Sequence, residues 1–314
     1  MTDAPGDRLA AINDELRGQA DVYEQTPWLP LESNPEIFSN FGHQIGMPAR
    51  WRFVDVLGLD PELLAMAAGH DRKVAALILL FPCSHMIYSA RAEEDQQLAR
   101  ATESGSSGSK RKAEGESSAG GFTPRDDAFF LVQHAGFGNA CGTIAAIHAI
   151  SNARGEFGGF ESGDGGGGGG GAVAPLGAFC DATAGVSPAE RGRALQRARE
   201  LKGISDCQAA HNPAAQTSCP ARDGPDLDHH FVAFSLLRGG ERGEARLVEL
   251  DGTKRCAIDH GAAEELASQV EGGGGAGACN IFLSAAGAVI RKRFMEVDPS
   301  NIEFSLMALC EADD

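Results

Sequence analysis

Long apolar runs are missing from this chain of 314 residues. No stretch approaches the roughly 18 consecutive apolar residues of a transmembrane helix. The opening residues MTDAPGDRLA also lack the charged-then-apolar layout of a secretory signal. We therefore expect a soluble protein of the cytoplasm, with the nucleus as a further compartment and no membrane partner.

Basic residues are also scarce, since 27 Lys and Arg stand against 44 Asp and Glu, for a net charge of −17. A surface of this sign repels phosphate backbones, which argues against a nucleic-acid partner. It fits a partner protein with a basic face, and we expect the chain itself to be a monomer.

The cysteine pattern lacks a CxxC pair and any regular framework, although eight cysteines are present. A chain of this length does not depend on disulfides, so free thiols are the default, and one of them is a candidate nucleophile. His148 falls within the predicted helix that begins near Cys141, where we expect a satisfied, partly buried residue. The histidines that occur singly without ligand spacing are His43, His70, His85 and His211. We expect neither a metal nor a cofactor.

Glycine is in excess, at 41 residues, and much of it lies in low-complexity segments at about 101–121, 163–174 and 272–278. Such segments bury too little apolar surface to offset the entropy of ordering them. Residues 1–26 are polar and predict an appended, partly helical arm. We expect a single domain over 27–314, interrupted by these flexible insertions.

Local patterns indicate that helices and a sheet are mixed. The run VAALILLF at 74–81 is typical of a strand buried on both faces, at the centre of a sheet. Asn34 and Pro35 predict a helix start. The segment 187–203 predicts one helix, with Ser187 as its cap and Gly203 as its stop.

Cys141 is the strongest nucleophile candidate. The spacing of the isoleucines in NACGTIAAIHAISN (139–152) predicts a helix that Asn139 caps. A thiol in the first turn of a helix is favoured as thiolate, the reactive form. For an arbitrary cysteine, an ordinary buried thiol is favoured by roughly ten to one, so Cys141 needs a base.

A predicted hairpin supplies that base. FVAFSLL and ARLVEL are apolar strands joined by a polar, Gly-rich turn. With the turn centred on residues 240–241, His230 lies opposite Asp251, close enough for the carboxylate to orient the imidazole. His229 points to the other face, and spacing alone does not choose between the two histidines.

Nucleophile, base and orienting carboxylate together favour a cysteine hydrolase. A papain-type protease is the less favoured alternative, because its histidine follows the cysteine by roughly 130 residues or more. Here His230 follows Cys141 by 89 residues.

These motifs resemble the ubiquitin carboxyl-terminal hydrolases, a family of cysteine peptidases marked by an NACGT segment, an HF strand and an ELDG turn. The corresponding residues are 139–143, 230–231 and 249–252. Further blocks resemble the same family, namely WLPLESNPE, WRFVDVLGLDPELL, SPAERGRAL and RFMEVDPSNIEFSLMAL.

The resemblance implies an α/β fold: an α/β/α sandwich with a central, mainly antiparallel sheet and a knotted path. It makes Cys141 the nucleophile, His230 the general base and Asp251 its orienting group. Gln133 is the candidate for holding the oxyanion. It lies eight residues before Cys141, two more than in the family, because HAGFG (134–138) carries two extra residues.

The resemblance also implies the substrate, which is ubiquitin carrying a small or unstructured adduct on its C-terminal glycine. A crossover loop at about 205–228 would limit the bulk of that adduct. Two alternatives are a hydrolase for another ubiquitin-like modifier and a catalytically impaired ubiquitin-binding scaffold. The ubiquitin-binding candidates by family position are Pro30, Leu31, Glu32, Glu36 and Asp55.

Overall fold

The computed structural model describes residues 26–69, 72–105, 123–161, 173–222, 224–225, 227–239, 243–269 and 280–312. The predicted N-terminal arm and the three low-complexity insertions lie outside these residues, apart from their edges at 26, 101–105 and 173–174.

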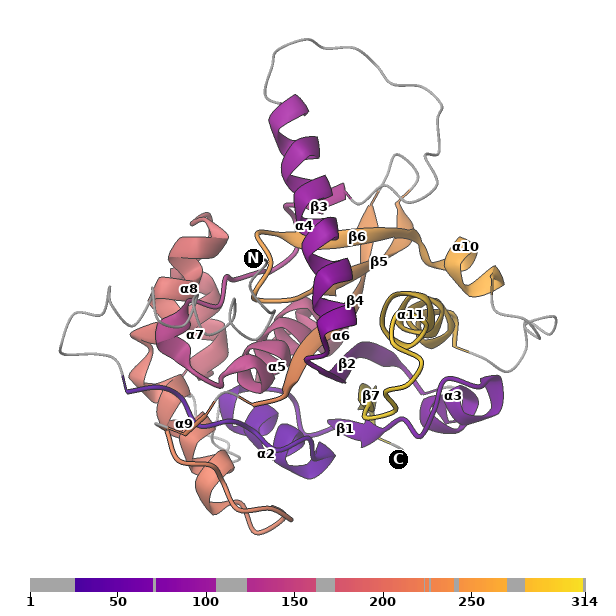
Figure 1. Cartoon of the computed structure of the whole chain (residues 1–314). Coiled ribbons are helices and arrows are strands. Elements are labelled where there is room, and N and C mark those ends of the chain that lie inside the picture. The colour runs from indigo at the N-terminus through magenta and orange to yellow at the C-terminus, as the bar shows by residue number, and fades with distance from the viewer. Residues whose placement is uncertain are drawn as a thin grey trace.

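A seven-stranded sheet in the order β1-β7-β2-β4-β5-β6-β3 forms the centre of the molecule (Figure 1). Every neighbouring pair of strands is antiparallel. The strands are β1 Trp51–Asp55, β2 Val74–Pro82, β3 Thr123–Arg125, β4 His229–Gly239, β5 Glu244–Leu250, β6 Ala257–Ala262 and β7 Ser305–Glu311. The expected mainly antiparallel sheet is therefore present.

Helices cover both faces of the sheet, with α2, α5 and α7 to α9 on one side and α3, α10 and α11 on the other (Figure 1). The helices are α2 Pro35–Ile45, α3 Pro61–Ala68, α4 His85–Gly105, α5 Cys141–Asn152, α6 Arg154–Phe157, α7 Pro175–Ala182, α8 Pro188–Gln196, α9 Arg199–His211, α10 Ala263–Ser268 and α11 Ile281–Ile290, with a 3-10 turn η1 Ala135–Phe137 and a π-helical turn η2 Arg291–Met295. This is the expected α/β/α layering. Within the described ranges, no helix has the length and apolarity to cross a membrane.

Strand β2 is buried on both faces, as its continuous apolar run predicts. Ala76 and Ile78 point into the core shared with α2 and α5, whereas Leu77, Leu79 and Phe81 point into the core shared with α3 and α11. The expectation that β2 is the central strand is wrong by one place. β2 is third of seven, and its neighbour β4 is in the middle.

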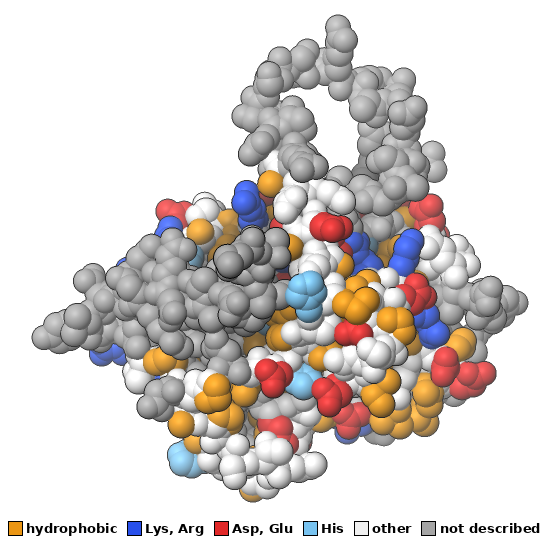
Figure 2. Space-filling view, viewed as in Figure 1, with side chains coloured by type: hydrophobic (Ala, Val, Ile, Leu, Met, Phe, Trp, Pro, Cys, Tyr) orange, Lys and Arg blue, Asp and Glu red, His pale blue; other side chains and the backbone are white. Residues whose placement is uncertain are grey.

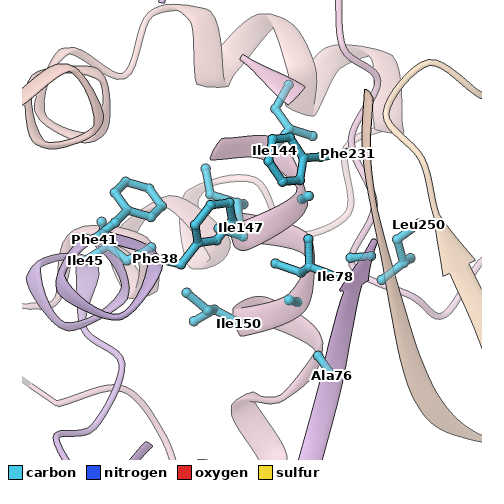
Figure 3. Close-up of a cluster of buried hydrophobic side chains, with 14 of the residues drawn as sticks. Phe38, Phe41, Ile45, Ala76, Ile78, Ile144, Ile147, Ile150, Phe231 and Leu250 are labelled. Carbon is cyan, nitrogen blue, oxygen red and sulfur yellow. The ribbon is translucent and has the colours of Figure 1, made fainter. Parts of the chain in front are cut away.

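Helix α5 packs along this sheet and thereby fixes the position of Cys141, its first residue. Ile144, Ile147 and Ile150 are almost completely buried. Figure 3 shows them between the aromatic side chains of α2 and the sheet residues of β2 and β4. The helix that carries the candidate nucleophile is therefore held rigidly from two sides.

The helix expected over 187–203 is two helices. The capping box at Ser187 and Glu190 is present and begins α8, but α8 ends at Gln196 and α9 begins at Arg199. Gly203 does not stop α9, because its backbone is not left-handed and the buried face of α9 continues to Ala209. The expected crossover loop from 205 is therefore helical as far as His211, and the described part of the loop begins at Asn212.

Candidate active site

Cys141 begins α5 without a side-chain cap. The N-cap residue is Ala140, so the prediction that Asn139 caps this helix is wrong. Asn139 stands one position too early and lines the pocket around Cys141 instead. With no capping side chain competing, the amides of Gly142 and Phe231 hydrogen-bond to the Cys141 sulfur. The Gly142 amide is a free donor of the helix N-terminus, where anions are favoured, and the Phe231 amide comes from β4.

His230 and Asp251 lie beside this thiol. His230 Nε2 is 2.8 Å from Asp251 Oδ1. The same imidazole ring also forms a hydrogen bond with Cys141. Since Nε2 faces the carboxylate, Nδ1 is the nitrogen left for the sulfur. The Asp251 carboxylate also accepts from the Thr253 amide at 2.9 Å and hydroxyl at 2.8 Å. The Phe81 ring meets the imidazole edge to face, at 5.6 Å between centroids.

The strand register differs by two residues from the predicted one. Ala233 pairs with Leu250 and Gly239 with Glu244, so the residue opposite Asp251 would be Val232, two residues after the expected His230. His230 and Asp251 meet as diagonal neighbours. A shift of two residues keeps each side chain on its face, which is why the predicted contact survives the wrong register.

The three side chains favour a thiolate–imidazolium pair. Burial opposes a charge on each group, but the Asp251 carboxylate and the Cys141 thiol together raise the pKa of His230 to about 10. Burial alone would raise the pKa of the Cys141 thiol. The hydrogen bond from His230 and its charge outweigh burial, and the pKa of Cys141 is therefore lowered. Despite burial, the pKa of Asp251 is held well below its usual value by His230 and Arg91.

Arg91 on α4 is a part of this site that the sequence did not reveal. Its guanidinium, 4% exposed, lies 2.5 Å from Asp251 Oδ2 and 2.6 Å from Glu249 Oε1. Glu249 is in turn 2.9 Å from His260 Nε2. Helix α4 has no motif that separates Arg91 from an ordinary surface arginine, and only the ELDG turn indicated Glu249.

The pocket at Cys141 is small and is formed by three segments of the chain. Its lining residues are Gln133, His134, Ala135, Gly138, Asn139, Cys141, Leu227, His229, His230 and Thr253. The candidate oxyanion residue therefore shares a pocket with the candidate nucleophile. Leu227, which also lines the pocket, lies near the end of the loop that the resemblance predicted at about 205–228.

The two extra residues before Cys141 are accommodated in η1. Its last residue, Phe137, is fully buried and packs against Trp28, with 5.5 Å between ring centroids. Gln133 remains in the pocket, where its Nε2 donates to the Gly138 carbonyl at 3.3 Å and its Oε1 is buried without a hydrogen-bond partner. The insertion is thus folded into the core and does not displace Gln133 from the site.

Comparisons with known proteins show the family. The family model described as "Ubiquitin carboxyl-terminal hydrolase, family 1" matches residues 28–272. The chain belongs to this family. It is 31% identical to a ubiquitin carboxyl-terminal hydrolase of Drosophila melanogaster, over 91% of this chain and 98% of the relative. It is 32% identical to one of Aplysia californica, over 87% and 96%.

A solved structure shows the same fold. The catalytic domain of Trichinella spiralis UCH37, bound to ubiquitin vinyl methyl ester, matches with a TM-score of 0.51 at 17% identity, covering 95% of this chain and 100% of that one. By family, this protein is a ubiquitin carboxyl-terminal hydrolase, a cysteine-type peptidase.

His229 and His148 have partners other than Cys141 and Asp251. His229 is partly exposed and faces Glu303 at 3.6 Å. His148 is fully buried and satisfied, accepting from the Leu131 amide at 3.1 Å. Among the residues that the structure describes, no group of His, Cys, Asp and Glu could hold a metal ion. The seven cysteines among them are all free thiols.

The five candidate ubiquitin-binding residues divide into three settings. Pro30 and Leu31 are buried, with Leu31 in the core beneath α5. Glu36 in the first turn of α2 and Asp55 at the end of β1 are exposed. Glu32 is half-buried and accepts hydrogen bonds from the loop that follows α9. Only the acidic candidates present charge at the surface.

Proposed function

We propose that this hydrolase cleaves small or unstructured adducts from the C-terminal glycine of ubiquitin through Cys141, His230 and Asp251. The observation that carries the proposal is the hydrogen-bonded chain from the Cys141 thiol through His230 to Asp251 within one pocket. The perturbed pKa values of Cys141 and His230 support it, because a thiolate beside an imidazolium is ready for acyl transfer.

The reaction proceeds in two steps. The Cys141 thiolate attacks the terminal glycyl carbonyl, and the tetrahedral intermediate collapses as His230 gives its proton to the leaving amine, which leaves a thioester on Cys141. His230, now neutral, takes a proton from water, whose oxygen attacks the thioester and restores the thiol while releasing the ubiquitin carboxylate. Asp251 keeps the imidazole oriented and offsets its charge throughout.

The oxyanion is held by donors at the start of α5. The Cys141 amide lies in the uncapped first turn, where the helix dipole favours negative charge. Gln133 supplies the second donor once its Nε2 turns from the Gly138 carbonyl toward the substrate. The unpartnered Gln133 Oε1 supports this turn, because rotation costs that oxygen no hydrogen bond.

Charge, as well as family, supports ubiquitin as the substrate. A net charge of −17 favours a basic partner surface, and complementary charge mainly raises the rate of association. Acidic side chains gather below the centre of the face in Figure 2. We infer that Glu36 and Asp55 take part in this docking, that Glu32 contributes next to the pocket, and that residues 27–314 act as one monomeric catalytic domain.

The test is turnover of a fluorogenic C-terminal amide of ubiquitin. Wild-type protein should release the fluorophore, and Cys141→Ala should reduce the rate to background. His230→Gln should lose at least about 10³-fold, whereas His229→Gln, which alters a residue outside the triad, should retain most activity.

The alternatives give different results. Turnover of the matching amide of another ubiquitin-like modifier, but not of ubiquitin, would reassign the substrate. Ubiquitin binding without any turnover by wild type would favour the scaffold.

A further inference from the structure

His148 is a fully buried histidine that the mechanism does not use. It lies seven residues after Cys141 on α5, and Asn152 lies four residues further along the same helix. Residues at these spacings share one face of a helix. Both side chains bind the backbone of the segment 129–133, which carries Gln133. The face of α5 that begins with the candidate nucleophile is therefore also the face that holds this segment.

The imidazole of His148 joins two parts of the site. Its Nε2 accepts from the Leu131 amide at 3.1 Å, which leaves the proton on Nδ1, and Nδ1 donates to the Leu250 carbonyl at 3.3 Å. Leu131 precedes Gln133 by two residues, and Leu250 directly precedes Asp251. One side chain on the helix of the nucleophile thus bonds to the backbone beside the oxyanion candidate and beside the orienting carboxylate.

The imidazole is fixed in protonation state and in orientation. Burial lowers the pKa of His148 to about 4, against the opposing effect of its hydrogen bonds. At neutral pH, Nε2 therefore keeps the lone pair that the Leu131 amide requires. The Phe130 ring stacks on the imidazole, with 5.1 Å between centroids and 15° between planes.

The two segments that His148 bonds also touch each other. The Gln133 amide donates to the Gly252 carbonyl at 2.7 Å. A Cβ on Gly252 would lie 3.0 Å from the Gln133 Cβ and 3.0 Å from the Ile144 side chain of α5. Both segments and the helix are therefore closely packed. Because such packing leaves little room for adjustment, a shift of one segment is transmitted to the other.

We propose that His148 is a positioning residue, which holds the Gln133 and Asp251 segments in place against the helix of Cys141. This rests on the proposed function and adds to it a residue that touches neither the substrate nor the reacting atoms. The bond to the segment 129–133 keeps Gln133 within reach of the oxyanion, and the bond to β5 keeps Asp251 aligned with its imidazole partner. Misplacing a catalytic group by about 1 Å can cost about 10²-fold in rate.

Two variants separate the two bonds. An asparagine amide reaches only as far as Nδ1 of a histidine and can donate to the Leu250 carbonyl, whereas a glutamine amide reaches the place of Nε2 and can accept from the Leu131 amide. His148→Asn therefore loses the Leu131 bond, and His148→Gln loses the Leu250 bond.

Ser39→Ala is the matched control. Ser39 Oγ is buried, accepts from the Phe53 amide of β1 at 2.8 Å and donates to a carbonyl of its own helix, α2, at 2.7 Å. The substitution therefore also breaks buried hydrogen bonds to the backbone, but between elements that do not line the pocket at Cys141.

Turnover of the fluorogenic C-terminal amide of ubiquitin gives kcat and KM for each variant. His148→Asn should lower kcat by about 10²-fold, the loss typical of one oxyanion donor. KM should change less than about threefold, since that donor acts in the transition state. In the Gln133→Ala background the same substitution should cost less than about threefold, because the donor that it positions is already absent. Ser39→Ala should change kcat less than about threefold.

His148→Gln tests the other bond. It should lower kcat by about tenfold both with and without Gln133, because it acts through Asp251. It should also slow the alkylation of Cys141 by iodoacetamide near pH 6 by at least about threefold, because a misaligned Asp251 weakens the pairing of His230 with the thiolate.

Thermal unfolding shows whether each variant is folded at the assay temperature. The positioning role is overturned if folded His148→Asn loses no more kcat than Ser39→Ala, or if its loss is the same with and without Gln133. Should His148→Asn fold poorly, unchanged alkylation of Cys141 in His148→Gln would overturn it equally. Failure of the proposed function looks different, because wild type would then leave the amide itself intact.

Discussion

At the scale of single residues, Cys141 and His230 titrate as a pair, and this sets the pH range of the chemistry. The pKa of Cys141 is lowered chiefly by His230 against the effect of burial. An ordinary thiol, with a pKa of about 8.5, is less than about 1% thiolate at pH 6. Alkylation of Cys141 by iodoacetamide near pH 6 should therefore be fast in wild type and at least about tenfold slower in His230→Gln.

Peptide-resolved mass spectrometry checks this, with the exposed Cys207 as an internal control. Equal rates at Cys141 in the two proteins would contradict the ion pair. The pKa of His230, raised to about 10, sets the alkaline limit: above it the imidazole loses the proton that the leaving amine needs, so kcat/KM falls.

The next prediction concerns Arg91, whose positive charge offsets the negative charge of two buried carboxylates. Replacing Arg91 with Met leaves Asp251 and Glu249 buried without the guanidinium that bridges them. Breaking a buried pair in this way costs about 3–5 kcal/mol, so the free energy of unfolding in urea should fall by that amount.

Arg154→Met is the matched control, since Arg154 and Asp181 form an exposed pair whose loss costs about 0–1 kcal/mol. Similar losses for both variants would mean that Arg91 does not compensate the buried charge.

The sequence indicated the three residues of the proposed triad and missed the side chains that pack around them. Cys141, His230 and Asp251 stand in short motifs whose residue types have few other combined uses, so their proximity could be predicted. Arg91 lies on a helix without motif, more than 150 residues from both of its carboxylate partners. Only the folded sheet brings it beneath Asp251, and no local pattern encodes that contact.

At the scale of elements, replacing either of two glycines in neighbouring helices with alanine should change the stability of the protein in opposite directions. A Cβ on Gly192 in α8 would lie 2.0 Å from the Val132 carbonyl oxygen, whereas a Cβ on Gly203 in α9 meets nothing within 4 Å. Gly192→Ala must push α8 away from the segment that carries Gln133, at a cost of roughly 1–3 kcal/mol. Gly203→Ala should stabilise by about 0.5–1 kcal/mol, as alanine does in a helix interior.

Thermal unfolding and turnover of the amide substrate measure both variants. Gly192→Ala should also lose activity, because α8 supports the 132–134 segment through the Val132 amide and the Pro188 carbonyl, at 3.0 Å. Equal thermal stability of Gly192→Ala and Gly203→Ala would show that α8 does not pack tightly against the Val132 carbonyl.

Helix starts were more predictable than helix ends in this protein. The caps at Asn34 and Ser187 are local hydrogen bonds, and both are present. The end of α8 and the continuation of α9 past Gly203 depend on which side chains pack against α2 and the core, which the sequence does not display. The same holds for β4, whose central place follows from the pairing of distant strands.

At the scale of the whole molecule, the charge of −17 acts over distances that no single contact spans. Raising salt from about 0.01 M to about 1 M shortens the screening length from about 30 Å to about 3 Å. If acidic surface steers ubiquitin to the pocket, kcat/KM for the ubiquitin amide should fall by about tenfold or more over this range. kcat should stay nearly constant, because His230 and Asp251 are buried.

Removing surface charge should reproduce part of this effect. The double variant Glu36→Gln, Asp55→Asn keeps the fold, since both side chains are exposed, and should lower kcat/KM at low salt while flattening its salt dependence. Stopped-flow association with fluorescent ubiquitin separates the on-rate from the off-rate, and the change should lie in the on-rate. An unaltered salt dependence in the double variant would place the docking surface elsewhere on the molecule.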